Sequence, residues 1–240
     1  MKLTAYSYTN QGGRDHNEDS VRCLTEAGVF VLADGLGGHQ CGEVASGLAA
    51  DVIAAGCAEA APTPASLLEL FQKANEAILD AQKTPGREDM KTTAVALSIQ
   101  NEKAIWAHIG VSRLYHFSDG AVTPLTRDHS VTYRKYLGGE ITYMDICHDD
   151  DRSSLLRVLG KSPCVPEAAE KTVKAGDAFL LCSDGFWEYV LETEMEQTLS
   201  ASSTPEEWLV KMCNVLQQKE STEHDNFTAA AVFYTGEEKA

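Results

Sequence analysis

The chain has 240 residues, of which 43% are hydrophobic and 23% charged, a composition typical of one large globular domain or two small ones. Its 20 basic residues stand against 36 acidic ones, and the formal net charge of −16 opposes a broad attraction to nucleic acid or anionic lipid. No stretch approaches the roughly 18 uninterrupted apolar residues of a membrane span, and MKLTAYSYTNQGG lacks the apolar core of a signal peptide. We therefore expect a cytoplasmic protein that binds neither nucleic acid nor membrane.

The first half of the chain alternates strand and helix patterns. Short apolar runs with turn residues between them predict strands, and apolar residues at helical spacing predict helices. The expected strands are 21–25, 28–33, 92–100, 103–110 and 112–118, with the last three consecutive and antiparallel. The expected helices are 43–60 and 64–82, the second starting behind Thr63 and Pro64, a typical cap and first-turn pair.

The second half begins with a more helical region and returns to strands. We expect helices over 129–137 and 152–159 that flank a loop with a run of three aspartates, 149–151, read as a solvated loop. A long strand over 171–183, helices over 192–200 and 204–219, and a last strand over 226–234 follow. Strand runs separated by helix pairs, rather than βαβ units, favour an α+β fold. The best match is a β-sandwich of two antiparallel sheets with helices on both outer faces.

The seven cysteines are odd in number and widely spread, and they contain no CxxC pair. This pattern indicates neither a disulfide framework nor a zinc knuckle, so we interpret them as reduced packing residues.

Acidic residues next to turn formers occur in four short segments scattered over the chain: RDHNED (14–19), ADGLGGH (33–39), CSDGFWE (182–188) and HDN (224–226). Magnesium and manganese prefer oxygen ligands, and a two-metal site needs carboxylates delivered from several elements to one point. Segments near both ends would then build one site, which favours a single catalytic domain over residues 1–240.

Two of these segments place an Asp-Gly pair at the tip of an apolar strand, at Asp34 and at Asp184. Each pair alone is compatible with an ordinary turn in which the aspartate caps the backbone. The segment after Asp184 is more typical of a helix start than of a return strand, which argues against a simple hairpin.

Eight segments resemble, in their order along the chain, the motifs of the PPM family, the 2C-type metal-dependent serine/threonine protein phosphatases. These segments are RDHNED, ADGLGGHQCGEVAS, KTTAVAL, HIGVSRLY, LTRDHS, RSSLLRVLG, CSDGFWE and HDN. The resemblance covers nearly the whole chain. It implies a helix-flanked β-sandwich with a binuclear manganese or magnesium centre at one end.

The resemblance also implies roles for individual residues. The first metal would be held by Asp34, Asp184 and Asp225. The second would be held by Asp34, by the Gly35 carbonyl and, directly or through water, by Glu18. Arg14 would bind the substrate phosphate, as suits a bidentate guanidinium. Supporting positions beside the ligands are expected for Asp19, Asn226 and Glu188. The two ions would activate a water for in-line attack on phosphorus, with Arg14 and Asp34 in catalytic positions.

The chain departs from the family pattern at three places. Val111 occupies the position of the aspartate that helps bind a third metal in bacterial members, so we expect a two-metal enzyme unless Asp184 and Glu188 hold the third ion. Lys91 replaces a glycine. Leu36 replaces a general-acid histidine, which leaves His39 as a weak candidate acid, although a hydrogen bond from His39 to the glycine turn is the favoured interpretation.

The expected function is hydrolysis of phosphoserine and phosphothreonine on proteins, in opposition to a serine/threonine kinase. The chain is most similar to stand-alone bacterial phosphatases, and among them to those of type VI secretion clusters. That similarity implies a forkhead-associated-domain protein and its cognate kinase as partners. We also expect the protein to be a monomer. Two alternatives stay open: a pseudophosphatase that binds phosphoproteins with little turnover, suggested by Val111, and a phosphatase of small metabolites.

Overall fold

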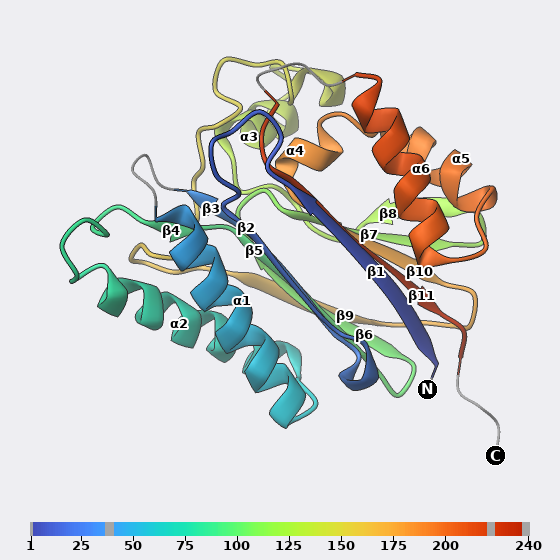
Figure 1. Cartoon of the computed structure of the whole chain (residues 1–240), viewed down its shortest axis with the longest axis horizontal. Coiled ribbons are helices and arrows are strands. Elements are labelled where there is room, and N and C mark those ends of the chain that lie inside the picture. Colours follow the sequence, from blue (N-terminus) through green and yellow to red (C-terminus); the bar gives the residue numbers. More distant parts are fainter. Residues whose placement is uncertain (1, 37–40, 220–223, 237–240) are drawn as a thin grey trace.

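The fold is a sandwich of two antiparallel sheets with helices on both outer faces (Figure 1), in a computed structural model that describes residues 2–36, 41–219 and 224–236. The first sheet has the order β1 (Leu3–Asn10), β11 (Phe227–Tyr234), β10 (Ala178–Cys182), β7 (Arg113–Ser118), β8 (Ala121–Pro124). The second has the order β2 (Asp19–Leu24), β3 (Val29–Leu36), β5 (Ala94–Gln100), β6 (Lys103–Ile109), β9 (Glu167–Thr172), with β4 (Lys91–Thr92) paired to β3. This confirms the expected fold class.

The helices divide between the two faces. The second sheet is covered by α1 (Gly42–Glu59) and α2 (Pro64–Ala81), and the first by α5 (Glu192–Ser200) and α6 (Pro205–Gln217). At the end of the sandwich drawn uppermost in Figure 1, loops carry α3 (Val131–Leu137), the 3-10 turn η2 (Tyr143–Asp145) and α4 (Asp184–Trp187). A 3-10 turn η1 (Thr25–Ala27) joins β2 to β3. No described helix is long and apolar enough to cross a membrane.

Successive side chains along each strand point to opposite faces of its sheet, and this divides the core into three layers. In β3, Phe30 and Leu32 face the space between the sheets, while Val29 and Val31 face α1 and α2. Such two-sided burial explains why the central strands read as nearly continuous apolar runs. All seven cysteines are free, as expected.

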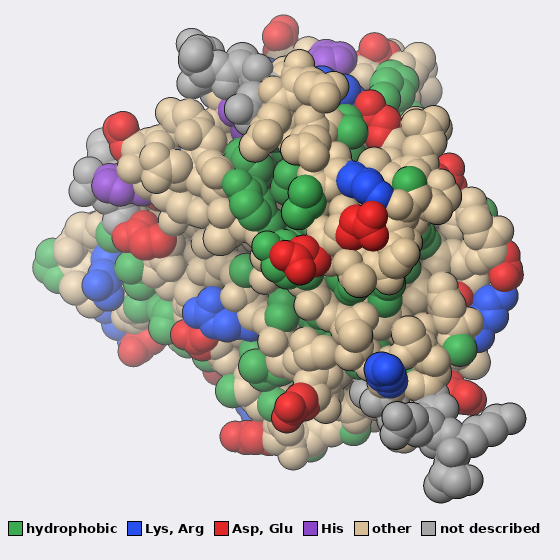
Figure 2. Space-filling model, turned by 45° about the vertical axis from the view of Figure 1, so that its right-hand side comes forward, with side chains coloured by type: hydrophobic (Ala, Val, Ile, Leu, Met, Phe, Trp, Pro, Cys, Tyr) green, Lys and Arg blue, Asp and Glu red, His purple; other side chains and the backbone are tan. Residues whose placement is uncertain are grey.

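Charged side chains are distributed over the surface. On the face in Figure 2, lysine and arginine side chains are interspersed with the more numerous aspartates and glutamates. Any site for a phosphorylated substrate therefore depends on local cations rather than on the field of the whole molecule.

Three sequence-based expectations were wrong. The helix expected over 152–159 is a turn followed by bridges in which Leu155 pairs with Ser130 and Leu159 with Thr92. The strand expected over 171–183 is two strands in opposite sheets, β9 and β10, separated by a turn at Gly176 with φ +95°. The three consecutive strands of 92–118 do not share a sheet, because the chain crosses from β6 to β7 at Gly110, whose φ is +100°. Only glycine adopts such φ values at little cost.

Candidate metal centre

The acidic segments predicted to converge do so at one end of the sandwich. A cavity of about 460 Å³ is lined by Arg14, Glu18, Asp34, Gly35, Asp184, Asp225 and Asn226, together with Asp15, His16, Leu36, Ser153 and Leu155. The carboxylates come from the loop before β2, the end of β3, the start of α4 and the loop before β11. Residues more than 200 positions apart thus form one acidic cluster.

Strand pairing sets the position of the innermost carboxyl groups. The antiparallel register of β2 and β3 places Asp19 opposite Asp34. The carboxyl group of Asp34 lies next to that of Asp184, the first residue of α4. The apolar strand β10 therefore delivers Asp184 from the first sheet to meet Asp34 from the second.

Two glycines permit this close approach. A Cβ on Gly35 would lie 2.4 Å from the backbone of Gly42 and 2.6 Å from the Glu18 carbonyl oxygen. A Cβ on Gly185 would lie 2.2 Å from the Asn226 carbonyl oxygen. Neither glycine has a positive φ, so both are needed for the close packing between loops and not for a left-handed turn.

Asn226 fixes the loop that carries Arg14 and Glu18. Its side-chain oxygen accepts the Glu18 backbone N–H at 2.8 Å, and its Nδ2 donates to the carbonyls of Gln11 at 2.8 Å and His16 at 2.9 Å. Because each of these bonds is to backbone, the predicted supporting role of Asn226 is orientation of the loop.

Ser183 has a similar role that sequence analysis did not identify. Its hydroxyl donates to Asp19 Oδ2 at 2.9 Å and accepts the Thr228 N–H at 2.9 Å. The only signal in the sequence was its place directly before Asp184.

The carboxyl groups of Asp19, Asp34 and Asp184 have raised pKa values. Burial, and then repulsion from Asp184, Asp19 and Asp225, raises the pKa of Asp34 well above its usual range. Burial also raises the pKa of Asp19 to about 7, and the pKa of Asp184 is raised by burial and by the Asp225 charge. Clustered, desolvated carboxylates of this kind are destabilising unless a cation compensates their charge.

The donor set fits hard divalent cations. Every candidate ligand is an oxygen, from the carboxylates of Glu18, Asp34, Asp184 and Asp225 and from the Gly35 carbonyl. Magnesium and manganese prefer such ligands, and a dication would relieve the repulsion among them.

Arg14 supplies a positive group at the mouth of the cavity. Its Nη2 donates to Asp225 Oδ2 at 2.9 Å, and 58% of its side chain is exposed. An arginine that is held at one nitrogen and otherwise exposed is free to bind a phosphate with the rest of its guanidinium.

A larger cavity of about 600 Å³ shares Arg14 and Asp225 with the metal cavity, and its other lining residues are Met144, Cys147, His148, Arg152, Glu188, Tyr189, Leu191 and Lys219. Glu188 thus lies beside the acidic cluster, as predicted. Its burial and the Asp184 charge raise its pKa to about 8.

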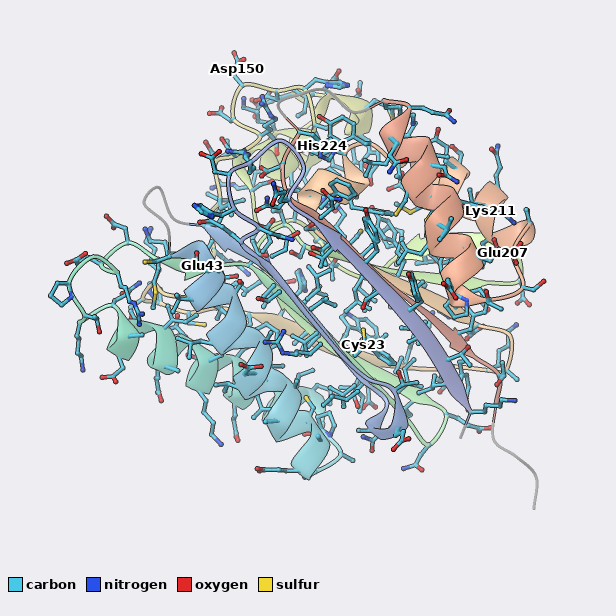
Figure 3. The ribbon with its side chains drawn as sticks, in the orientation of Figure 1. Cys23, Glu43, Asp150, Glu207, Lys211 and His224 are labelled. Atoms are coloured by element: carbon cyan, nitrogen blue, oxygen red, sulfur yellow. The ribbon has the colours of Figure 1, made fainter. Side chains whose placement is uncertain are left out.

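The remaining predicted positions have different outcomes. His39 lies outside the described residues. Val111 is buried, with 4% of its surface exposed, and its carbonyl accepts the Trp187 indole N–H at 3.0 Å. Asp150 is exposed at the outer tip of its loop (Figure 3), as expected for a solvated position. Asp149 and Asp151 of the same run instead pair with Lys135, each at 2.8 Å, and only 14% of the Asp149 side chain is exposed.

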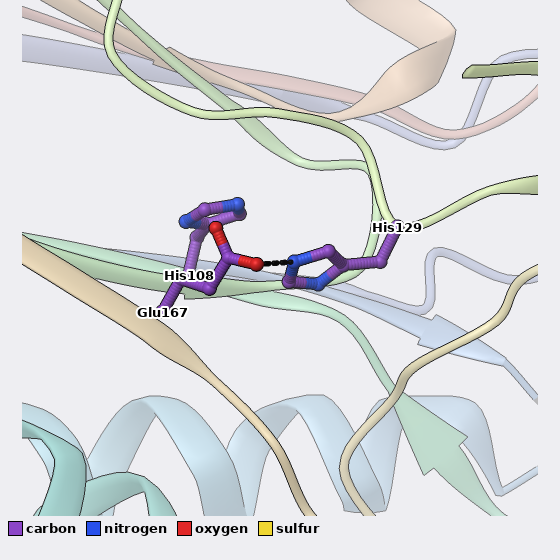
Figure 4. Close-up of side chains that lie close together, drawn as sticks. All are labelled: His108, His129 and Glu167. Carbon is purple, nitrogen blue, oxygen red and sulfur yellow. Dashed lines mark ion pairs between the residues drawn. The ribbon is translucent and has the colours of Figure 1, made fainter. Parts of the chain in front are cut away.

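A second group of potential ligands, His108, His129 and Glu167, has atoms within 4.8 Å of one another (Figure 4) but is poorly suited to a metal. The Gly110 N–H donates to His129 Nδ1 at 3.1 Å, and His129 Nε2 lies 3.3 Å from Glu167 Oε1 and 3.2 Å from Arg157 Nη1, so both ring nitrogens already have partners. The two rings are stacked on each other, with centroids 4.7 Å apart and an interplanar angle of 17°. Arg157 already neutralises Glu167 at 2.8 Å.

Sequence comparison identifies relatives over most of the chain. A family model described as Protein phosphatase 2C matches residues 9–227. The serine/threonine phosphatase stp of Listeria monocytogenes is 32% identical over 202 residues, which are 80% of each chain.

Solved structures agree with this result. The serine/threonine phosphatase PstP/Ppp of Mycobacterium tuberculosis has a TM-score of 0.89 at 28% identity, over 98% of this chain and 99% of that one. The PstP catalytic domain in complex with two manganese ions has a TM-score of 0.86 at 28% identity, over 96% and 97%. PppA, described as a key regulatory component of T6SS in Pseudomonas aeruginosa, has a TM-score of 0.82 at 27% identity, over 97% and 98%.

The same carboxylates that the motifs predicted line one cavity, and the family model spans all four acidic segments. This chain belongs to the protein phosphatase 2C family.

Proposed function

We propose that this protein hydrolyses phosphoserine and phosphothreonine monoesters on proteins with the aid of two manganese or magnesium ions. The observation that carries the proposal is the convergence of Glu18, Asp34, Asp184 and Asp225 on one cavity that Arg14 also lines. The serine/threonine phosphatase names of the relatives and the two manganese ions of the PstP complex support it.

The chain supplies the ligands and the phosphate-binding group. One ion would be held by Asp34, Asp184 and Asp225. The other would be held by Asp34, Glu18 and the Gly35 carbonyl. Bound dications lower the pKa of water and neutralise phosphate charge. Arg14 binds the equatorial phosphate oxygens and orients the ester, while Asn226 and Ser183 keep the ligand-bearing loops in place.

A third ion is not part of this proposal. The Val111 side chain is apolar and buried, so it offers no ligand, although Glu188 is retained beside Asp184. Titration of the protein with manganese, followed by calorimetry, should show two binding sites per chain.

The test is turnover of p-nitrophenyl phosphate and of a phosphothreonine peptide in the presence of manganese. Asp184→Asn should lower kcat at least about a hundredfold on both substrates, because it removes a charge from the ligand set. Asp150→Asn, at the exposed tip of its loop, is the matched control and should leave kcat unchanged. An inactive wild type that still binds the phosphopeptide would favour the pseudophosphatase instead.

We further propose that the physiological substrate belongs to a type VI secretion system, as a forkhead-associated-domain protein phosphorylated by its cognate kinase in the cytoplasm, and that the phosphatase acts as a monomer. The similarity to PppA supports this choice. Phosphoproteomics of a gene deletion complemented with wild type or with Asp34→Asn tests it. Accumulation of small phosphorylated metabolites without phosphoprotein changes would support a metabolite phosphatase.

A further inference from the structure

The candidate ligand Asp184 is carried by α4, a single turn of helix whose orientation depends on its tertiary contacts. One turn of helix has little stability of its own. Phe186 packs into the apolar core of the first sheet, whereas the indole of Trp187 contacts polar groups. Asp184 and Trp187 are three positions apart and therefore lie on the same face of the helix. The contacts that hold Trp187 thus also orient Asp184.

Trp187 is buried and held in two ways. Its indole N–H donates to the Val111 carbonyl at 3.0 Å, and its ring lies over the Arg113 guanidinium, whose Cζ is 3.4 Å from the ring centroid. A cation that is stacked on an aromatic face away from water interacts more strongly than an exposed one. The hydrogen bond fixes the direction of the indole, and the stacking fixes its plane.

Arg113 is itself held in place by its other contacts. Its Nε and Nη2 donate to the two carboxylate oxygens of Asp128 at 2.9 and 2.6 Å, and both residues are buried. Its Nη1 donates to the hydroxyls of Tyr115 and Tyr143, both at 3.0 Å. Moving Arg113 would leave a buried charge without its partner, which is strongly unfavourable. The guanidinium is therefore a fixed support for the indole ring.

The segment that contains Val111 also contacts the strand end that carries Asp34. Val111 and Ser112 lie where the chain crosses from β6 in the second sheet to β7 in the first. The Ser112 hydroxyl oxygen lies 2.7 Å from that of Thr93, which accepts the Asp34 N–H at 3.2 Å. This crossing therefore links the end of β3 to α4, the two elements that bring Asp34 and Asp184 together.

Repulsion between the carboxylates opposes this arrangement when no cation is bound. The Asp184 carboxyl lies next to that of Asp34 and close to the Asp225 charge. Like charges at such positions favour movement of α4 away from the cluster. A rigid anchor resists that movement, so that ion binding does not have to reorder the helix. The strength of the anchor is then measurable as manganese affinity.

We infer that Trp187, held by the Val111 carbonyl and the Arg113 guanidinium, is a positioning residue that keeps Asp184 ready to bind manganese. The inference rests on the proposed function, because it takes Asp184 as a metal ligand. It assigns Trp187 to metal affinity and not to the cleavage of the phosphoester.

The experiment is a calorimetric titration of the metal-free protein with manganese. Trp187→Phe keeps a ring over Arg113 but loses the indole N–H, and it should raise the dissociation constant of at least one manganese site about three- to tenfold, the effect of one neutral hydrogen bond. Trp187→Leu also removes the stacked ring and should raise it about ten- to hundredfold, as is usual for groups that orient metal ligands. With saturating manganese, kcat of Trp187→Phe on p-nitrophenyl phosphate should stay within about threefold of the wild-type value.

Trp208→Phe is the matched control. Trp208 is also buried, and its indole N–H donates to a backbone carbonyl, that of Met195, at 3.1 Å. It lies on α6, which packs on the outer face of the first sheet. Trp208→Phe should lower the melting temperature in EDTA to a similar extent as Trp187→Phe but leave the manganese constants within about twofold. A purely structural role of Trp187 would make the two variants behave alike.

Two results would overturn the inference: wild-type manganese constants in both Trp187 variants, or an equal loss of manganese affinity in Trp208→Phe. A wild type that binds two manganese ions but cleaves neither p-nitrophenyl phosphate nor a phosphothreonine peptide would refute the proposed function alone, and calorimetry would still decide the role of Trp187. A wild type that binds no manganese would overturn both.

Discussion

Gly35 shows how a single side-chain atom decides whether the metal centre assembles. The space where its Cβ would lie is filled by backbone atoms of Gly42 and Glu18, which cannot rotate away as a flexible side chain would. The first turn of α1 and the loop before β2 therefore come together only around a residue without a side chain.

Gly35→Ala should lower the free energy of unfolding by about 1–3 kcal/mol, the usual cost of overpacking, and weaken manganese binding. Denaturant unfolding and calorimetry measure the two effects. Gly47→Ala is the matched control, since its nearest neighbour is the Ser20 Oγ at 3.9 Å and it lies inside α1. Replacing an interior helical glycine should stabilise the protein by about 0.5–1 kcal/mol. Wild-type stability in Gly35→Ala would contradict this account of the close approach around Gly35.

At the scale of elements, the helices are delimited by signals that stand in the sequence. The Thr204 side chain accepts the Glu207 N–H at 3.1 Å, with Pro205 in the first turn of α6, and Thr63 with Pro64 repeats the arrangement at α2. α6 then buries Trp208 and Leu209 against the first sheet. The cap fixes where the helix starts, and the apolar face fixes where it packs.

Thr204→Ala should lower the free energy of unfolding by about 1 kcal/mol, because it leaves a backbone N–H of the first turn without its acceptor. The adjacent Ser203→Ala removes an exposed hydroxyl with no hydrogen bond to the described residues and should change stability by less than about 0.5 kcal/mol. Chemical denaturation of both variants makes the comparison. Because Thr204 lies at the start of α6, and the chain leads to Asp225 from the other end of the helix, kcat should be unchanged, and a loss of activity in Thr204→Ala would contradict this expectation.

At the scale of the whole molecule, carboxylates that repel one another are clustered at one end of the sandwich. A protein of net charge −16 desolvates several carboxylates next to one another where its two sheets meet. The apolar layers on both sides of each sheet provide the stability that this arrangement needs. Metal binding and folding are therefore coupled.

Without metal, stability should fall as pH rises from about 6.5 to 8. The folded protein retains protons on Asp19, with a pKa of about 7, and on Glu188, with a pKa of about 8, whereas the unfolded chain has released them near pH 4. Since the folded state binds more protons, each group lowers the free energy of unfolding by up to about 1.4 kcal/mol per pH unit until the pH passes its folded pKa, above which its contribution to the slope disappears. His129, whose pKa is lowered to about 4, acts in the opposite direction but only below about pH 6.5.

Thermal unfolding in EDTA at several pH values measures how the stability of the metal-free protein changes with pH. Manganese should flatten this dependence or reverse its sign, because binding requires the deprotonated carboxylates. Asp19→Asn should reduce the slope in EDTA. A melting temperature that stays constant or rises from pH 6.5 to 8 in EDTA would contradict the prediction.

The sequence alone was sufficient to predict the fold class, the helices α2 and α6, and the acidic segments that contain Asp34, Asp184 and Asp225. These features are local or depend on residue type: caps and periodicity act within a few residues, and oxygen-rich turns identify ligands for hard cations. Tertiary structure decided which sheet each strand joins, since β6 and β7 are adjacent in the chain but lie in opposite sheets. It also decided the bond that joins Tyr143 to Arg113, 30 residues away, because contacts across such separations follow from packing between layers and leave no periodic pattern in the chain.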